Sequence, residues 1–231
     1  MPNATPKTTL ADTVCDQIRS DIAMRVLEPG QKINPKELAA RYGVSETPVR
    51  TALNRLVSEN LIEIFPRQGM CVKALNIKTC EETFQLRRMM ELYYADKMVL
   101  VYRIDGSFRN KLEKNVQRHL EIMQEMSLDS SLADYWENYS YDVKFHNMLL
   151  SCASNQLLMT VYNNLNPFLY INYIYERQSK ERLLSGVYEH QHILDALKSG
   201  DVELVRKRIS EHLDVAQEAI ITILRISGFD K

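Results

Sequence analysis

Four side chains in the second half of the sequence could together bind a metal ion. Asp142 and His146 are four residues apart, so they are adjacent on one face of a helix. His190 and His212 each lie 11 residues from Asp201, which falls in the turn between two expected helices. If those helices form an antiparallel hairpin, both imidazoles are displaced about 16 Å from the turn and are level with each other. Three imidazoles and one carboxylate at one depth predict a site for a divalent transition metal such as Zn or Ni.

The apolar surroundings of these residues strengthen the prediction. Each of the four lies on an otherwise apolar helical stripe, and a buried acid or imidazole without a partner is costly. The four are therefore expected to be one another's partners. His119 and His192 have no evident facing partner in the sequence, and we interpret them as core histidines whose hydrogen bonds are satisfied.

A second group of polar residues lies on a short helix near the N-terminus. In GVSETPVRTAL, residues 43–53, and just beyond, the apolar side chains recur at i, i+3, i+4, i+7 and i+8, and they are Val49, Ala52, Leu53, Leu56 and Val57. The opposite face carries Thr47, Arg50, Thr51 and Asn54, which can hydrogen-bond to bases or phosphates. Ser45 occupies the N-cap position, and Pro48 lies in the first turn, where its missing N–H costs little.

The segment upstream predicts a partner for this helix. The sequence NPKELAARYG predicts a short helix with Asn34 as N-cap and Pro35 at its first position. Gly43 would end the helix with a left-handed backbone conformation. Two short helices joined by a tight glycine turn are typical of a helix-turn-helix, which presents its second helix to the major groove. Such pairs also occur in ordinary helical bundles, so the pattern alone leaves both interpretations open.

The next residues favour the DNA-binding interpretation. LIEIF and MCVKAL are strand-like and PRQG separates them, which predicts a β-hairpin with Arg67 and Gln68 at its tip. A hairpin that follows a recognition helix is the wing of a winged helix-turn-helix.

The run from about Val14 to Leu75 resembles the DNA-binding domain of the GntR family of bacterial regulators. The resemblance rests on PG at 29–30, ELA at 37–39, GVS, TPVR, AL, RL and the wing Gly69. It implies DNA contacts from two groups of residues: Lys36, Ser45, Glu46, Thr47, Arg50 and Thr51 in the helix pair, and Arg67, Gln68 and Gly69 in the wing. The family usually has Arg and Glu where this chain has Glu46 and Thr51. An acid can accept from a cytosine amino group, so we expect an operator that differs from the family's common one.

The composition and charge of the chain narrow the classes of protein to which it could belong. The 231 residues are 45% apolar and 26% charged, and seven Gly and seven Pro favour a mainly helical fold. Residues 1–75 carry a net charge of +2 and the remainder −3, so the DNA prediction rests on the motif and not on bulk charge. No apolar run approaches the roughly 20 residues of a membrane span. Four Cys without CxxC spacing predict reduced thiols, and we expect a cytoplasmic protein.

The expected fold is mainly α, with an N-terminal winged helix-turn-helix and a C-terminal all-α bundle. We predict a disordered arm at 1–8, the winged domain at 9–75, a linker at 76–78 and the bundle at 79–231. The first helix is expected to present Leu10, Val14, Ile18, Ile22 and Val26 and to end at Pro29-Gly30. About six helices should follow, with breaks near residues 105–106, 129–130, 153–155, 185–186 and 199–200.

The second half also resembles a known domain, the ligand-binding domain of the FadR-like branch of GntR regulators. DVKFH, SCASNQLL, EHQHILDAL, and GD with EHL 11 residues after that Asp carry the resemblance over residues 79–226. It implies a metal at Asp142, His146, His190 and His212. It also implies an effector contact at Arg87, although a plain i,i+4 pair with Glu91 is an alternative. The tyrosines 162, 170, 173 and 175 suit a core or subunit interface, and we expect Tyr139 and Tyr170 to line the pocket.

These features predict a homodimeric bacterial transcriptional repressor that binds a palindromic DNA operator and a small carboxylate effector. The sequence leaves two alternatives open. One is a constitutive DNA-binding regulator with a purely structural metal. The other is a metal-dependent hydrolase, since open positions on such a metal could activate water. Against the hydrolase, the sequence shows no spare buried acid with a claim to be a general base.

Overall fold

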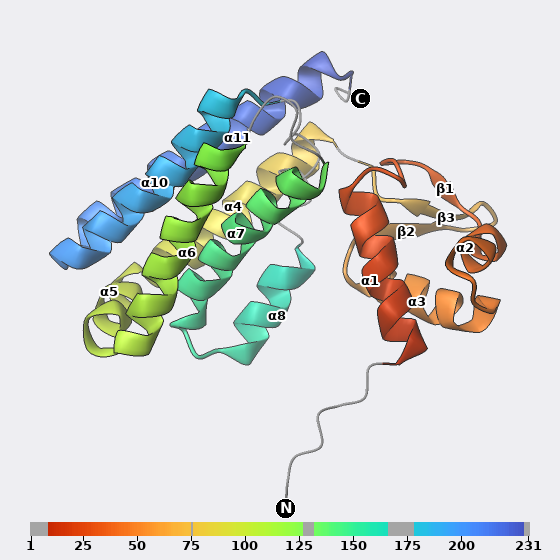
Figure 1. Ribbon diagram of the computed structural model, residues 1–231, viewed down its shortest axis with the longest axis horizontal. Helices are drawn as coiled ribbons and strands as arrows, with labels where there is room; N and C mark the ends of the chain where they lie inside the picture. Colours follow the sequence, from red (N-terminus) through yellow and green to blue (C-terminus); the bar gives the residue numbers. More distant parts are fainter. Residues whose placement is uncertain (1–8, 75, 127–131, 166–177, 229–231) are drawn as a thin grey trace, which may run out of the picture. The chain divides into compact units, whose positions relative to one another are not determined.

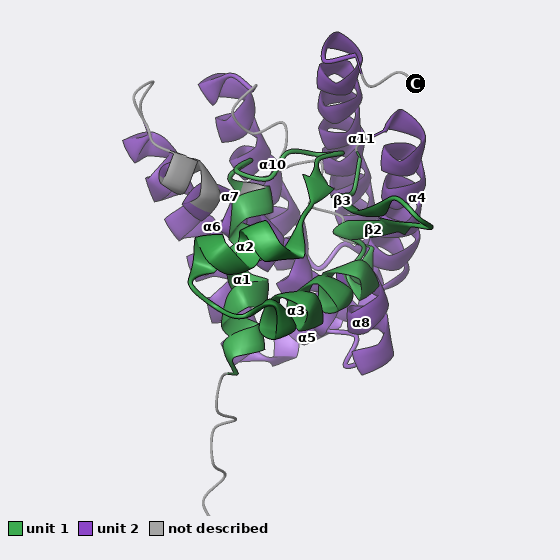
Figure 2. Ribbon diagram, turned by 90° about the vertical axis from the view of Figure 1, so that its right-hand side faces the viewer, with its two compact units in different colours: residues 1–74, 164–166 green, residues 75–163, 167–231 purple. Residues whose placement is uncertain are grey.

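The computed structural model describes residues 9–74, 76–126, 132–165 and 178–228. The chain divides into two compact units, residues 1–74 with 164–166, and residues 75–163 with 167–231 (Figure 2). The expected arm at 1–8 and the candidate pocket residue Tyr170 lie outside the described residues, as do Tyr173 and Tyr175.

The first unit is a helix-turn-helix with a small sheet (Figure 1). Its elements are α1 (Leu10–Ala23), β1 (Lys32–Ile33), α2 (Pro35–Tyr42), α3 (Glu46–Ser58), β2 (Ile62–Phe65) and β3 (Gly69–Val72). Its core is apolar, and the side chains of Val14, Ile18, Val49, Leu53 and Leu56 are fully buried. The predicted winged architecture is therefore present.

The sheet adds a strand that the sequence did not predict. Its order is β1-β3-β2 and both pairings are antiparallel, with Ile62 opposite Val72 and Phe65 opposite Gly69. The two residues of β1 pair with Cys71 and Met70 of β3. A strand of two residues is too short to show an alternating apolar pattern in the sequence. It forms because its backbone pairs with a neighbouring strand.

The first helix is shorter than predicted. A capping box between Thr9 and Asp12 opens it, and it ends at Ala23, well before Pro29-Gly30. Arg25 then adopts a left-handed backbone with a φ of 54°, which turns the chain. As a result Val26, expected on the buried stripe, is 41% exposed, and Leu27 takes the buried place instead.

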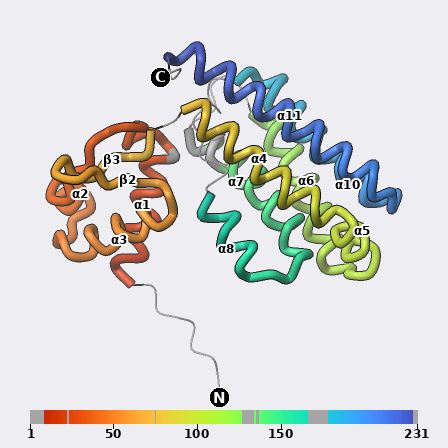
Figure 3. Tube along the Cα trace, turned by 180° about the vertical axis from the view of Figure 1, so that it is seen from behind, coloured from red at the N-terminus to blue at the C-terminus, as the bar shows by residue number. Residues whose placement is uncertain are grey.

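The regular secondary structure among the described residues of the second unit is all helical (Figures 1 and 3). It contains α4 (Ile77–Tyr93), α5 (Ala95–Ile104), α6 (Gly106–Glu125), α7 (Leu132–Ser151), α8 (Gln156–Asn164), α10 (Lys180–Ser199) and α11 (Val202–Ile226). Helix α11 packs against both α10 and α4, and α6 packs against α7 and α10. In the described part of the chain, no helix is both long and apolar enough to cross a membrane.

Three boundaries differ from the predictions. The helix α4 begins at Ile77 with Asn76 as its N-cap, so residues 77 and 78 belong to the bundle and not to a linker. A break at Tyr94, which no Gly or Pro announces, separates α4 from α5. Conversely, α10 runs straight through Ser185-Gly186, because the apolar stripe continues across the glycine and keeps the helix packed.

The turn between α10 and α11 sets the level of the two histidines on that hairpin. Gly200 ends α10 with a left-handed φ of 78°, a conformation that glycine adopts without a steric penalty. Asp201 then caps α11 by accepting a hydrogen bond from the Leu204 N–H at 3.0 Å. The hairpin places His190 and His212 close together, with 4.7 Å between their ring centroids.

Candidate functional site

The helix-turn-helix leaves the predicted DNA-facing residues at the surface of the first unit. The Asn34 carboxamide caps α2 by accepting from the Lys36 N–H, and Gly43 ends that helix with a left-handed φ of 66°. Helix α3 buries Val49, Ala52, Leu53 and Leu56, which leaves the opposite face exposed. Lys36, Ser45, Thr47, Arg50 and Thr51 are all exposed. Their contact with DNA stays a prediction.

Two details of this surface differ from what the sequence suggests. Ser45 holds the N-cap position, but its side chain makes no capping hydrogen bond. Glu46 pairs with Arg50, with Nη2 3.0 Å from Oε2, so the two residues at the centre of the predicted reading face hold each other in the free protein. The pair is mostly solvent-exposed, and base contacts can replace it.

The wing presents the other predicted contacts. The N–H of Gln68 donates to the carbonyl of Phe65 at 3.0 Å and closes the turn between β2 and β3. Arg67 and Gly69 both have positive φ, 64° and 94°. Arg67, Gln68 and Gly69 are exposed, as expected of a wing tip.

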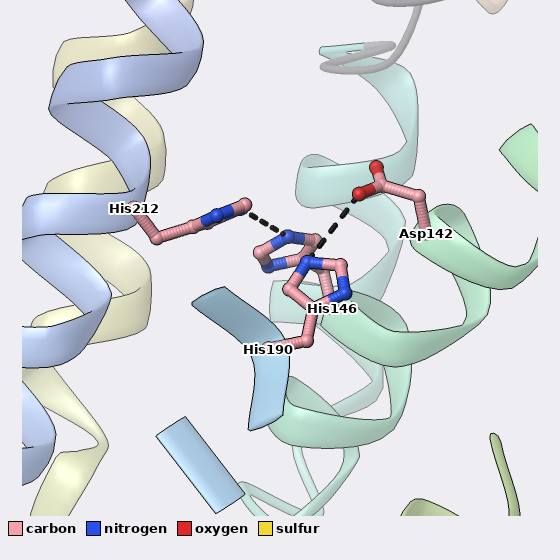
Figure 4. A group of neighbouring side chains, drawn as sticks. All are labelled: Asp142, His146, His190 and His212. Carbon is pink, nitrogen blue, oxygen red and sulfur yellow. Dashed lines mark hydrogen bonds and ion pairs between the residues drawn. The ribbon is translucent and has the colours of Figure 1, made fainter. Parts of the chain in front are cut away.

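In the second unit, three helices bring the four predicted metal ligands together (Figure 4). Asp142 and His146 come from α7, His190 from α10 and His212 from α11. One ligand atom from each lies within 4.8 Å of all the others. His146 and His190 are fully buried, and Asp142 and His212 are 8% and 4% exposed.

The distances inside this cluster are short. Nε2 of His146 lies 3.1 Å from Nε2 of His212, and Nε2 of His190 lies 3.4 Å from Oδ1 of Asp142. Within the described residues, neither ring nitrogen of His190 makes a hydrogen bond, and neither does Oδ2 of Asp142. Buried polar atoms normally have partners, so these atoms suit a ligand that the side chains themselves do not supply.

Two further carboxylates orient the histidines. Oε2 of Glu91 accepts from Nδ1 of His146 at 2.8 Å, and Oε2 of Glu189 accepts from Nδ1 of His212 at 2.8 Å. Burial alone would raise the pKa of Glu91, but His146 and Arg87 outweigh it and hold that pKa well below its ordinary value. Burial also opposes ionisation of Glu189, yet its hydrogen bond to His212 lowers its pKa. Both carboxylates are therefore ionised at neutral pH.

These contacts fix where the imidazole protons lie. An ionised carboxylate only accepts hydrogen bonds, so Nδ1 of both His146 and His212 carries a proton. The two Nε2 atoms then lie 3.1 Å apart, close enough to share one proton or to bind one cation. The convergence of Asp142 and His190 on the same point favours a metal ion, and hydrogen-bonded carboxylates behind ligand histidines are typical of metal sites.

The protonation states of His146 and His190 also suit a metal ion. Burial lowers the pKa of His146, and burial together with the neighbouring imidazoles lowers the pKa of His190 well below its ordinary value. Both are thus neutral at neutral pH, and neutral imidazole is the form that binds metals.

Arg87 and Tyr139, the described effector candidates, lie in the interior of the same unit. Arg87 is fully buried and its Nε donates to Oε1 of Glu91 at 2.9 Å, so the i,i+4 pair that the sequence left as an alternative is present. Tyr139 is 8% exposed. The Tyr162 hydroxyl, also fully buried, donates to Oε1 of Glu91 at 2.9 Å. Whether these residues touch an effector stays a prediction.

The structure changes the interpretation of the two remaining histidines. His192 is exposed, so it is not the core residue that we predicted. His119 is buried, but neither of its ring nitrogens makes a hydrogen bond within the described residues. Its ring lies 5.9 Å from that of His190 and stacks on Tyr141 at 6.1 Å. Burial lowers the pKa of His119. It therefore borders the cluster, a position that its spacing in the sequence did not reveal.

Comparisons with known proteins agree with both units. Residues 10–72 match the family described as bacterial regulatory proteins, gntR family, and residues 82–215 match the FCD domain. The transcriptional repressor RspR of Escherichia coli is 26% identical over 88% of this chain and 85% of its own length. The gluconate operon transcriptional repressor of Bacillus subtilis is 24% identical over 90% and 83%.

Among solved structures, E. coli McbR/YncC shares the fold. It superposes with a TM-score of 0.76 at 20% identity, over 94% of this chain and 99% of that one. The family and the names of the relatives indicate a transcriptional regulator and not an enzyme. The chain belongs to the GntR family of bacterial regulators and combines a helix-turn-helix domain with an FCD domain.

Proposed function

We propose that this DNA-binding regulator is a repressor that binds its operator as a homodimer and responds to a small organic acid held at a metal ion in the FCD domain. The observation that carries the proposal is the pair of opposed Nε2 atoms of His146 and His212, 3.1 Å apart with both Nδ1 protons committed to carboxylates. With His190 and Asp142 directed at the same point, that arrangement suits a cation bound by both nitrogens.

The donor set fits a divalent transition metal. His146, His190 and His212 would supply three neutral imidazoles and Asp142 one carboxylate, a combination that suits Zn, Ni or a similar ion. Glu91 and Glu189 would hold two of the imidazoles in the ligating tautomer. The metal would supply a positive charge inside the bundle.

The same donor set favours an anionic effector. A divalent ion bound by one carboxylate keeps about one positive charge, and four protein ligands on a six-coordinate ion leave two positions open. A carboxylate, alone or with an adjacent hydroxyl, can fill both. Tyr139 lies on α7 three residues before Asp142, and Arg87 lies on α4 one turn before Glu91, so both belong to the helices that surround the cluster.

The metal assignment is tested by elemental analysis of purified variants. His190→Ala and His212→Ala should each lose most of the bound metal, because each removes a ligand from the cluster. His192→Ala is the matched control, since His192 lies on the same helix as His190 but is exposed, and it should keep wild-type metal content. Equal metal content in all three variants would refute the site.

The effector assignment is tested by thermal unfolding with a panel of organic acids. Ligand at 100 times its Kd adds roughly 2.7 kcal/mol to the free energy of unfolding, a readily measured shift. The acid should stabilise metal-loaded protein and not chelator-stripped protein. Equal stabilisation of both forms would place the acid elsewhere. No stabilisation of the loaded form by any acid would instead favour a purely structural metal.

The proposed control of DNA binding is a shift between two populations of the dimer. An operator with two-fold symmetry presents half-sites about one helical turn, or 34 Å, apart. Effector binding would favour a dimer whose winged domains no longer match that spacing. Sedimentation of the protein on a DNA fragment selected from random sequence should give two chains per site. One chain per site would refute the dimeric part of the proposal.

A further inference from the structure

A hollow of about 610 Å³ lies between α6 and α7, apart from the proposed metal ligands. The two helices pack side by side (Figures 1 and 3). Its volume lies within the range of roughly 300–1,000 Å³ that is typical of small-molecule sites. The residues that line it are Lys111, Lys114, Asn115, Arg118, Tyr141, Lys144, Asn147, Met148 and Ser151.

The charge of this lining is one-sided. Four of the nine residues are cations and none is an acid, although residues 76–231 as a whole carry a net charge of −3. Lys111, Lys114 and Arg118 are spaced i, i+3 and i+7, so they form one stripe along α6, and Lys144 faces them from α7. Among the described residues, Lys111 and Lys114 form no ion pair, whereas Arg118 pairs with Glu121 at 3.1 Å and the Lys144 ammonium lies 4.5 Å from the centre of the Tyr141 ring. The two lysines without an ion pair would concentrate anions in the hollow.

Two carboxamide oxygens in the same lining lack a hydrogen-bond donor in the part of the chain that the structure describes. They are Oδ1 of Asn115 and Oδ1 of Asn147, and Asn115 is only 7% exposed. The Nδ2 group of Asn147 donates to the Val143 carbonyl at 3.0 Å, which fixes the orientation of that amide and leaves its oxygen as an acceptor. Buried acceptors of this kind call for a donor, and a ligand hydroxyl would supply one.

We infer that this hollow is a second ligand site, which binds a small hydroxylated phosphate ester. Lys111 and Lys114 would bind the phosphate through charge-assisted hydrogen bonds, with Arg118 and Lys144 adding positive charge beside them, and the Asn115 and Asn147 oxygens would accept from the hydroxyls of the ligand. The site is distinct from the proposed metal centre. The two are linked by ring contacts, because Tyr141 in the lining of the hollow stacks on His119, and His119 lies beside His190. Its test must therefore separate binding in the hollow from binding at the metal.

The experiment is calorimetric titration of chelator-stripped, full-length protein with inorganic phosphate and with glycerol 3-phosphate. Potassium chloride holds the ionic strength constant, and glycerol serves as the uncharged probe. Glycerol 3-phosphate should bind more tightly than inorganic phosphate, and glycerol should not bind measurably. The double variant Lys111→Gln/Lys114→Gln should bind glycerol 3-phosphate at least about tenfold more weakly, since the loss of one charge-assisted hydrogen bond is worth about that factor.

The matched control is Lys78→Gln/Lys207→Gln, which removes the same charge from exposed positions outside the hollow. It should bind as the wild type does. If both double variants bound glycerol 3-phosphate equally weakly, the loss of affinity would come from net charge alone, and the site would be overturned. Binding that is absent from stripped protein, or that survives unchanged in Lys111→Gln/Lys114→Gln, would also overturn it. Glycerol 3-phosphate binding no more tightly than inorganic phosphate would overturn the role of the two amides.

Discussion

Replacement of Glu91 by Gln tests the buried network behind the proposed metal centre. The Glu91 carboxylate accepts three hydrogen bonds, from Nε of Arg87 at 2.9 Å, Nδ1 of His146 at 2.8 Å and the Tyr162 hydroxyl at 2.9 Å. All four side chains are fully buried. Glutamine has nearly the same volume, so the change creates no cavity and isolates the effect of the charge and of one lost acceptor.

The expected size of the effect follows from these contacts. Loss of a buried ion pair by removal of one partner costs about 3–5 kcal/mol of unfolding free energy, and the Arg87–Glu91 pair is fully buried. A glutamine NH₂ that faces His146 would also force the proton onto Nε2, the atom that should ligate the metal. Metal affinity should therefore fall by about 10- to 100-fold, the usual effect of losing such a carboxylate.

Both effects are measured separately. Denaturant unfolding of chelator-stripped Glu91→Gln gives the loss of stability, and competition with a chromophoric chelator gives the metal affinity. Glu189→Gln is the matched comparison, because Glu189 makes the equivalent bond to His212 but is part-exposed and pairs with Arg182 near the surface. It should lose metal affinity by a similar factor and less stability. Wild-type stability and wild-type metal affinity in Glu91→Gln would refute the reasoning.

Three further predictions concern the first unit and the cysteines. Arg50→Ala should weaken operator binding by about 1–3 kcal/mol if Arg50 contacts a base, without unfolding the domain, and unchanged affinity in a gel-shift titration at fixed salt would count against this face. Glu46→Arg removes the partner of Arg50. It should change the consensus DNA sequence selected from a random operator library, and not merely tighten binding to all DNA sequences. An identical consensus sequence would refute a reading role for Glu46. Burial raises the pKa of Cys80 and of Cys152 to about 12, so both thiols stay protonated at pH 8. Both should therefore resist iodoacetamide in the native protein. Cys71 is only partly buried and should react first. Peptide mapping checks this order, and early labelling of Cys80 would contradict the packing of α4.

Local signals account for most of the first unit. Asn34, Gly43 and Pro48 mark helix ends by their own backbone chemistry, and each lies where the sequence placed it. The end of α1 could not be predicted, because the apolar period continues to Val26 and the chain stops the helix through the backbone of Arg25. The strand β1 exists only through its pairing with β3.

The four clustered side chains of the second unit were predictable because their spacing is local or symmetric about one turn. Asp142 and His146 share a helix face, and Gly200 with Asp201 fixes the hairpin that levels His190 and His212. Glu91 and Glu189 were missed as partners, since Glu91 bonds a histidine 55 residues away. One signal was available. Cys80, Phe84, Arg87 and Glu91 are buried at i, i+4, i+7 and i+11, so Arg87 and Glu91 lie on an apolar stripe as the histidines do.

Control of DNA binding through the metal centre is tested most directly by measuring how an organic acid changes operator affinity with and without metal. The probe is fluorescence anisotropy of a labelled DNA fragment selected by the protein, with the acid that gives the largest thermal shift. Allosteric coupling of about 1–3 kcal/mol predicts a 5- to 150-fold loss of DNA affinity for metal-loaded protein and no change for chelator-stripped protein. An equal change in both forms, or no change in the loaded form, would contradict control through the metal centre.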